Sequence, residues 1–198
     1  MNIEDIRKNY RNFEDSKIEE LANSQITKLR PEVIPLLIEE IRRRNLSENL
    51  IKGIDAQLKV LNPDELIEYC LLIQNQSCPV CNSNTQKLNG ILLTEVVSYI
   101  FLTRTTKHLK IACSDCLQKF RNNSNSKTAL LGWWGFPWGI IKTIQGLIQN
   151  SKMSRNITLI EPSIILKTYV LENIGIIEPN RNDNIKLKQM LERANRVS

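Results

Sequence analysis

The chain has 198 residues, of which 41% are hydrophobic and 24% are charged, and its formal net charge is +6. This is the composition of an ordinary globular protein, large enough for one domain or for two to three small ones. The opening residues carry charges of both signs, which excludes the basic start and apolar run of a secretory signal and predicts a cytoplasmic protein.

The positive charge is concentrated in the middle of the chain. Residues 76–160 hold 10 basic and 2 acidic side chains, whereas residues 1–75 hold 11 and 14, and residues 161–198 hold 6 and 5. The central segment should therefore attract anionic surfaces such as nucleic acid, acidic lipid headgroups or an acidic protein.

Residues 1–75 are predicted to form a helical N-terminal unit. Three helix starts are marked, by a capping box, by a proline suited to a first turn, and by a polar cap before a proline. In chain order these signals are Ser16 with Glu19, Pro31, and Asn62 followed by Pro63, and a further helix is expected to cover Ser47 to Leu61. The second helix should end in the basic run 42–44, and Cys70 lies on the apolar face of the fourth, where a core position is expected.

Residues 76–128 are predicted to form a zinc ribbon around a β-hairpin. Residues 92–103 are rich in Val, Ile, Tyr and Phe, which is typical of a strand. The turn is expected at 104–107, because residues 109–113 alternate between apolar and other side chains as a second strand would. The polar tract 121–128 should end this module.

The cysteine spacing predicts one structural zinc ion. Two C-x-x-C pairs at tight turns aim four thiolates at one point about 2.3 Å away, as tetrahedral zinc requires. The predicted ligands are Cys78, Cys81, Cys113 and Cys116. Four thiolates leave no open coordination position, so this metal would not activate water. Buried free thiols and a thioredoxin-like redox site are the alternatives.

No catalytic constellation is recognisable. His108, the only histidine, could replace one cysteine ligand, but an exposed position on the strand is the expectation. The sequence offers no second histidine, no glycine-rich phosphate loop and no G-x-S-x-G elbow, so no pair of nucleophile and base can be nominated. The protein is therefore predicted not to be an enzyme.

Residues 129–155 combine an uncharged run with an amphipathic helix. The run 129–141 is 13 residues long, shorter than the roughly 20 that span a bilayer as one helix. The following helix should carry isoleucines on one face and Lys142 and Gln145 on the other. The tryptophans either pack over the zinc module or lie against an anionic membrane or a protein partner. The candidate contact residues are Trp133, Trp134, Trp138 and Lys142.

Basic side chains around the hairpin could instead contact the phosphates of a nucleic acid. The candidate anion contacts are Arg104, Lys107, Lys110, Lys119 and Arg121. Tyr99 and Phe101 share one face of the predicted strand but match no RNA-binding signature, so a core role is favoured for both.

The C-terminal segment, residues 156–198, is predicted to contain two helices. The first covers about 162–173 and should be stopped by Gly175, and the second covers about 184–195.

From Cys78 to about Asn150 the sequence shows, in order, C-P-V-C, F-L-T-R-T, C-S-D-C and L-L-G-W-W-G-F-P-W-G-I-I. In this order it resembles uncharacterised zinc-ribbon proteins, mostly bacterial, that join two cysteine knuckles to a G-W-W-G-x-P-W-G segment. The earlier stretch L-R-P-E-V-I-P-L-L-I-E-E-I-R-R-R-N-L looks like a short helical segment attached to varied bacterial proteins. The resemblance implies a zinc site at the four cysteines and membrane association of the tryptophan segment, and it implies no reaction.

Together these features predict an α+β protein with a helical unit, a zinc ribbon, an apolar turn with an amphipathic helix, and a helical C-terminus. The leading hypothesis is a non-enzymatic interaction protein that presents a basic, tryptophan-rich platform to a membrane surface or a protein partner. A nucleic-acid-binding module and an intracellular immunity or antitoxin-like binding protein are the alternatives. No small-molecule substrate is inferred. The expected location is the cytoplasm, with peripheral association at the inner face of the membrane as a variant.

Overall fold

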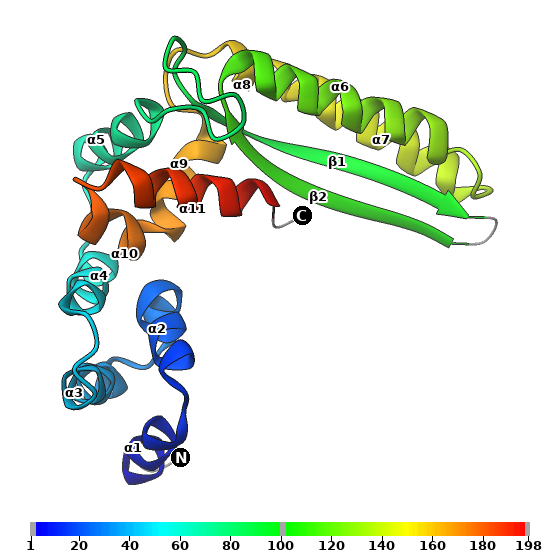
Figure 1. Cartoon of the computed structure of the whole chain (residues 1–198). Coiled ribbons are helices and arrows are strands. Elements are labelled where there is room, and N and C mark those ends of the chain that lie inside the picture. The colour runs from blue at the N-terminus through cyan, green and yellow to red at the C-terminus, as the bar shows by residue number, and fades with distance from the viewer. Residues whose placement is uncertain (1–2, 100–101, 197–198) are drawn as a thin grey trace. The chain divides into compact units, whose positions relative to one another are not determined.

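The structure is a computed structural model that describes residues 3–99 and 102–196. Most of these residues are helical, and the strands among them form one antiparallel two-stranded hairpin (Figure 1). The predicted mixture of helices with a β-hairpin is therefore confirmed.

The chain forms two compact units, and each unit combines segments that are far apart in the sequence. The helical unit consists of Met1–Tyr69 and Tyr169–Asp183, and the hairpin unit consists of Cys70–Thr168 and Asn184–Ser198. The segment predicted as a helical C-terminus is thus shared between the two units.

The helical unit is built from short helices around an aliphatic core. Its helices are α1 (Ile3–Asn12), α2 (Asp15–Ser24), α3 (Ile34–Arg43), α4 (Glu48–Leu58), the first part of α5 (Pro63–Gln74) and α10 (Ile174–Ile177). Short 3₁₀ turns cover Ile26–Lys28, Pro31–Val33 and Glu178–Asn180. Its fully buried aliphatic side chains include Ile18, Ile26, Leu37, Ile41 and Ile54. Burial of these side chains supplies the main stabilisation of the unit.

Two of the predicted helix starts are confirmed by their hydrogen bonds, and the capping box predicted at Ser16 and Glu19 is wrong. Ser47 caps α4 with its side chain. Asn62 and Glu65 form a reciprocal capping box, with N···O distances of 2.8 and 3.0 Å. Ser16 is not a cap, because α2 already begins at Asp15 and Ser16 lies in its first turn.

Gly175 does not stop a helix, contrary to the prediction. It lies inside α10, while the preceding helix α9 (Ile164–Glu172) ends before it. A Cβ atom added to Gly53 in α4 would collide with the carbonyl oxygen of Gly175. This glycine pair therefore allows two helices of the helical unit to approach backbone to backbone.

The basic run that ends α3 joins helices within the helical unit. The carboxylate of Glu40 is buried and accepts hydrogen bonds of 2.6 to 2.9 Å from Arg43 and Arg44. Arg44 also donates to the carbonyl oxygens of Tyr10 and Phe13, at or just beyond the C-terminal end of α1. One guanidinium thus binds carbonyl groups at and just beyond the C-terminal end of α1.

The Glu40 carboxylate should make the stability of the helical unit depend on pH. The hydrogen bond from Arg43 outweighs burial and, with Arg44, lowers the pKa of Glu40 from 4.5 to about 2. A carboxyl group with a lowered folded-state pKa stabilises the fold above about pH 4.5 and loses that contribution as the pH falls towards 2. Glu40→Gln should therefore cost about 2–3 kcal/mol at neutral pH and much less near pH 2.

Denaturant unfolding followed by circular dichroism at several pH values measures this difference. Glu39→Gln is the matched control, because the neighbouring Glu39 side chain is 61% exposed and makes one exposed ion pair with Arg7. A Glu40→Gln deficit that is the same at pH 7 and pH 2 would contradict the assigned role.

The hairpin unit packs a pair of helices along one strand of the hairpin. Strands β1 (Asn89–Tyr99) and β2 (Leu102–Ala112) pair in a register that runs from Asn89↔Ala112 to Tyr99↔Leu102. The helices of this unit are α6 (Ser114–Leu131), α7 (Trp138–Lys152), α8 (Ser154–Thr158), most of α9, and α11 (Asn184–Arg196). Helices α6 and α7 run side by side along β1 (Figure 1).

Two predictions within this unit are wrong. The residues 104–107, expected in the turn, lie in β2, where Arg104 pairs with Val97. The sequence from Val97 to Arg104 contains no Gly, Pro, Asn or Asp that would mark a turn between the strands. Phe101 lies outside the described residues. The polar tract 121–128 does not end the module but continues α6 to Leu131.

Small side chains of this tract, together with Asn150 of α7, complete the hydrogen bonding of β1. The outer edge of β1 has no neighbouring strand in the two-stranded sheet. Asn150 accepts from the Thr94 N–H (2.7 Å) and donates to the Thr94 carbonyl (2.9 Å). Thr128 accepts from the Val96 N–H, and Ser124 donates to the Thr94 carbonyl. Buried side chains thus take the place of a third strand.

A side chain of helix α11 completes the backbone hydrogen bonding of β2 at one position. Asn195 accepts from the Ile111 N–H at 2.8 Å and donates to the Ile111 carbonyl at 2.9 Å. The side-chain amide of an asparagine therefore mimics a peptide group of a neighbouring strand on both edges of the hairpin.

Candidate metal centre

The first cysteine pair lies in a tight turn after α5. The Asn82 N–H donates to the Cys78 carbonyl, and the Cys78 N–H donates to the Ser83 carbonyl, both at 2.9 Å. Asn82 has a φ of 60°, a left-handed conformation that asparagine tolerates better than most residues. This turn brings Cys81 back towards Cys78.

The second cysteine pair lies at the start of α6. Cys113 occupies the cap position and Cys116 lies in the first turn of the helix. Unpaired N–H groups and the positive end of the helix dipole favour negative charge at this place. Two thiolates would therefore be electrostatically favoured at this end of α6.

The hairpin brings the two pairs together. The four sulfur atoms of Cys78, Cys81, Cys113 and Cys116 all lie within 4.8 Å of one another, and Cys81 Sγ and Cys113 Sγ are 3.7 Å apart. A tetrahedral zinc ion with Zn–S bonds of about 2.3 Å places its sulfurs about 3.8 Å apart. The arrangement fits a metal ion held by four thiolates.

The electrostatics of the four cysteines also favour a bound cation. Burial raises the pKa of the Cys78 thiol, but backbone N–H donors that include the Cys113 amide outweigh it and lower the pKa to about 7. Burial and neighbouring sulfurs raise the pKa of Cys116 well above its usual range. Four thiolates this close would repel one another strongly, and a divalent cation removes that repulsion.

Side chains around the cysteines connect the two turns. Gln86, which follows the first pair, accepts from the Ser114 hydroxyl (2.8 Å) and donates to Asp115 (3.1 Å) at the second pair. Lys188 of α11 donates to Asn82 at 2.6 Å. Such outer contacts hold ligand-bearing turns in position.

The fifth cysteine and the histidine lie outside this centre. Cys70 is fully buried in α5, and burial raises its pKa to about 11, so the predicted core position is confirmed. His108 lies in β2 with a side chain that is only 14% exposed, so the expected exposed position is wrong. Its Nε2 atom lies 3.6 Å from Glu95, one of two acidic residues in 76–160.

The tryptophan segment does not form a core, contrary to one of the two interpretations. Trp133, Trp134 and Trp138 are 44%, 70% and 65% exposed. Helix α7 buries instead a face of small and polar residues, Gly139, Thr143, Gly146 and Asn150. Its large apolar residues therefore face outward.

Glycines place this segment close to the end of the hairpin. A Cβ atom on Gly135 would lie 2.6 Å from Thr103 Oγ1, and one on Gly139 would lie 2.8 Å from Ser98 Oγ. These close contacts favour glycine at both positions.

The predicted anion contacts do not form one surface. Arg104, Lys107 and Lys119 are exposed, whereas Lys110 is half-buried and Arg121 donates a hydrogen bond to Ser154. Side chains alternate along a strand, so Lys107 lies on the opposite face of β2 from Arg104 and Lys110. Lys142 is exposed and lines a small hollow with Trp138.

Comparisons with protein-family models, with curated proteins and with solved structures give no match for this chain. The resemblance to bacterial zinc-ribbon proteins therefore stays a prediction based on the cysteine and tryptophan motifs.

Proposed function

We propose that the chain is a non-enzymatic zinc-ribbon interaction protein that presents an apolar tip to the surface of an anionic membrane. One zinc ion held by the four cysteines would fix the base of the hairpin and the start of α6. Support comes from the four clustered sulfurs at one end of the hairpin. Structural zinc of this kind contributes folding energy and leaves the chemistry of recognition to other residues.

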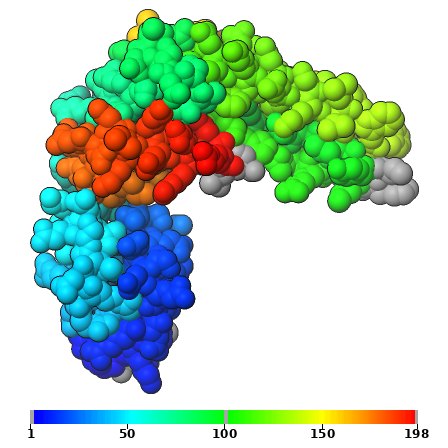
Figure 2. Space-filling view, in the orientation of Figure 1, coloured from blue at the N-terminus to red at the C-terminus, as the bar shows by residue number. Residues whose placement is uncertain are grey.

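The outward-facing apolar residues at the turn between α6 and α7 carry this proposal. We call this surface the apolar tip. It consists of Leu130, Leu131, Trp133, Trp134, Phe136, Trp138, Ile140, Ile141, Ile144 and Ile148, all at least 37% exposed. The yellow-green turn between the two helices lies at an outer end of the hairpin unit (Figure 2). Large apolar side chains that gather on a surface mark a site of interaction with a protein or a membrane.

The charge around the apolar tip favours an anionic membrane over a protein. Between Val96 and Ile160 the only acidic residue is Asp115. Exposed cations flank the tip at Arg104, Lys127 and Lys142. Each cation near an acidic lipid surface contributes about 1 kcal/mol, and tryptophans favour the headgroup zone.

The described helices limit how the tip could contact a bilayer. None of them is long and apolar enough to cross a membrane. We therefore propose contact at the interface, with the isoleucines of α7 among acyl chains and Lys142 and Gln145 in water.

Liposome binding tests this proposal. The protein should bind acidic vesicles, leave them in high salt and show a shift in tryptophan fluorescence when bound. Trp134→Ala should lower the affinity about tenfold or more, because it removes a side chain worth roughly 1.5–3 kcal/mol on burial. Val60→Ala is the control, since Val60 is 92% exposed but belongs to the helical unit.

Other results would identify a different partner. Vesicle binding that is insensitive to both salt and Trp134→Ala would reject the membrane proposal. Salt-dependent binding to nucleic acid without a change in tryptophan fluorescence would favour the nucleic-acid alternative.

A further inference from the structure

The two outer edges of the hairpin differ in their hydrogen bonding. In an antiparallel pair, residues directly opposite each other either bond to each other or both direct their backbone N–H and C=O groups away from the partner strand. Thr94 and Val96 of β1 and Ile111 of β2 are of the second kind, because their N–H groups bond side chains of α7, α6 and α11. The register extends this state to the residues opposite them and to every second residue of β2. The outward-directed residues of β2 are Thr103, Thr105, Lys107, Leu109 and Ile111.

Most of the outer edge of β2 has no hydrogen-bond partner. Asn195 of α11 bonds both backbone groups of Ile111. In the part of the chain that the structure describes, no group bonds the N–H or C=O groups of the other four outward-directed residues. The distance along the strand from Thr103 to Leu109 is about 20 Å at 3.4 Å per residue. In Figure 1, β2 continues well beyond the end of α11.

The edge lacks most of the features that prevent an exposed strand from pairing. Such features are prolines, bulges and charged side chains. The strands pair one to one along the whole register, so no bulge interrupts the edge. Strand β2 contains no proline or glycine, and Thr103, Thr105 and Thr106 favour an extended backbone. Of the three features only charge is present, so the edge can accept a further strand that complements this charge.

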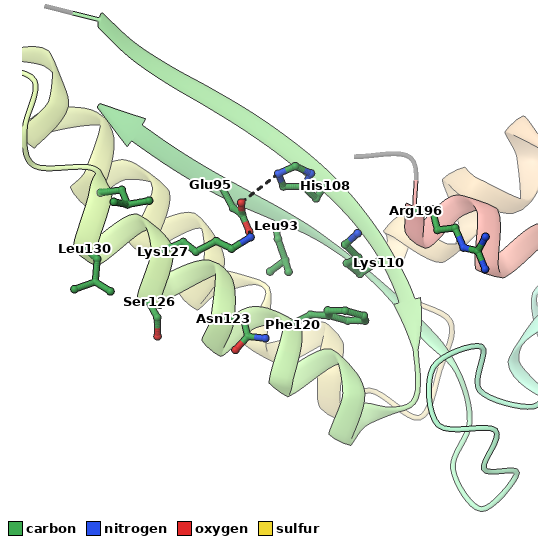
Figure 3. Close-up of a pocket in the computed structure, with 11 residues that line it drawn as sticks. Leu93, Glu95, His108, Lys110, Phe120, Asn123, Ser126, Lys127, Leu130 and Arg196 are labelled. Carbon is green, nitrogen blue, oxygen red and sulfur yellow. Dashed lines mark hydrogen bonds and ion pairs between the residues drawn. The ribbon is translucent and has the colours of Figure 1, made fainter. Parts of the chain in front are cut away.

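The charge of β2 indicates which kind of strand it would accept. The strand contains basic side chains and no Asp or Glu. Arg104 and Lys107 are exposed, and neither makes an ion pair with another described residue. The carboxylate of Glu95 on β1 does not offset them, because it lies 3.6 Å from His108 and 3.5 Å from Lys127 (Figure 3). The outer edge therefore has an excess of positive charge.

This charge opposes a second copy of the chain as the partner. Two identical β2 edges that pair around a twofold axis centred on Thr106 or Lys107 place their two Lys107 side chains on one face, as diagonal or direct neighbours. Like charges on neighbouring strands destabilise the pairing. A segment that carries carboxylates gains from the same side chains instead.

We propose that the outer edge of β2 binds an extended acidic peptide segment by strand addition. The backbone of the segment pairs with Thr103, Thr105 and Lys107, and its carboxylates lie beside Lys107 on one face and Arg104 on the other. Asn195 marks one end of the site, because its amide already occupies the place of a peptide group beside Ile111. The inference goes beyond the proposed function, because it does not require the apolar tip to bind a membrane.

Titration of the full chain with a blocked ten-residue peptide, in which pairs of valines alternate with pairs of glutamates, tests the inference. Binding should saturate at one peptide per chain by calorimetry. Amide hydrogen exchange at Thr105 and Lys107, followed by NMR, should slow at least about tenfold in the complex. Absence of binding, or unchanged exchange at both amides, would overturn the inference.

Two control peptides separate backbone pairing from charge. A peptide with proline in place of valine keeps the charge but loses half of its N–H donors, and one with lysine in place of glutamate keeps the donors but reverses the charge. Each should bind at least about tenfold more weakly than the acidic peptide. Equal binding of the proline peptide would show that charge alone attracts the segment, which would overturn strand addition.

Variants locate the site. Thr105→Pro removes an outward-directed N–H and no hydrogen bond to β1, so the hairpin should persist by circular dichroism while peptide binding weakens at least about tenfold. Thr105→Val keeps this N–H and is the matched control. Lys107→Glu keeps every backbone donor and should weaken acidic-peptide binding several-fold, so the test does not depend on the folding of the proline variant. Binding that survives both Thr105→Pro and Lys107→Glu would overturn the inference.

Two further results separate this edge from other interactions. Trp134→Ala should leave peptide binding unchanged while it reduces vesicle binding, so the inference and the proposed function can fail separately. Light scattering without peptide should give the mass of a monomer. A dimer that Thr105→Pro dissociates would assign the edge to a second copy of the chain and overturn the inference.

Discussion

Cys113→Ser is expected to lower the zinc content from about one ion per chain to near zero and to destabilise the hairpin unit by several kcal/mol. The apparent free energy of binding of a structural zinc ion is about 10–16 kcal/mol, and removal of one of the four ligands forfeits part of it. Cys113 occupies the cap position of α6 without a side-chain cap hydrogen bond, and its Sγ lies 3.7 Å from that of Cys81, so the expected loss comes from the metal centre and not from the helix cap. Elemental analysis and thermal melts measure the two effects.

Cys70→Ser is the matched control for this experiment. Cys70 is buried but lies outside the four-cysteine cluster, so we expect full zinc content and a loss of only about 1–2 kcal/mol. Equal losses in the two variants would contradict the assigned ligands. Wild-type protein that is prepared without chelators, contains no metal and has four freely titrating thiols besides Cys70 would also contradict them.

Asn150→Asp should be among the most damaging substitutions outside the metal centre, with a loss of about 3–5 kcal/mol. The change is nearly isosteric, but it replaces the donor to the Thr94 carbonyl with an oxygen and buries a carboxylate beside it. A buried acceptor that loses its donor costs about 1–3 kcal/mol, and an unpaired charge costs more. The hydrogen bond from Asn150 to Asn125 is lost as well.

Denaturant unfolding of Asn150→Asp measures this loss. Asn122→Asp is the control, because Asn122 is exposed on α6 and accepts a hydrogen bond from Arg121 that a carboxylate can also accept. The control should stay within about 0.5 kcal/mol of the wild type. A similarly small effect at Asn150 would show that its amide does not support β1.

Features that depend on residues close together in the sequence could be predicted well. The two C-x-x-C pairs need only local turns to orient their sulfurs, and a hairpin between them is enough to bring the pairs together. The capping box at Asn62 is likewise a contact over three residues. These parts of the fold and of the site could therefore be predicted from the local sequence, without knowledge of long-range packing.

Features that depend on long-range hydrogen bonds could not be predicted. Ser124 and Thr128 belong to the polar tract that was predicted to end the zinc module. Their hydrogen-bond partners lie about 30 positions away in β1, so their role in packing could not be recognised from the local sequence. The sequence between β1 and β2 contains no residues typical of a turn, so the first strand was predicted to continue into residues that belong to β2. Helix α1 buries only Ile6 and Tyr10, which is too weak an apolar pattern for prediction.

The buried face of α7 could not be predicted from the periodicity of its apolar residues. The periodicity of apolar residues placed the isoleucines on one face of the predicted helix and Lys142 and Gln145 on the other. These two polar residues are exposed, as expected. Periodicity cannot tell which face of a helix is buried when a third face carries small residues. Gly139, Gly146 and Asn150 form that third face, and the contacts that they make with β1 lie far away in sequence.

The interleaving of the two units sets an order of events during synthesis. The helical unit cannot be completed until Tyr169–Asp183 has been made, because α10 supplies the backbone that packs against Gly53. The 99 residues Cys70–Thr168 come first. At roughly 5–20 residues per second, they take about 5–20 seconds to be made. The four cysteines of the cluster have therefore left the ribosome's catalytic centre, and can meet a metal ion, before the last helix of the helical unit has been made.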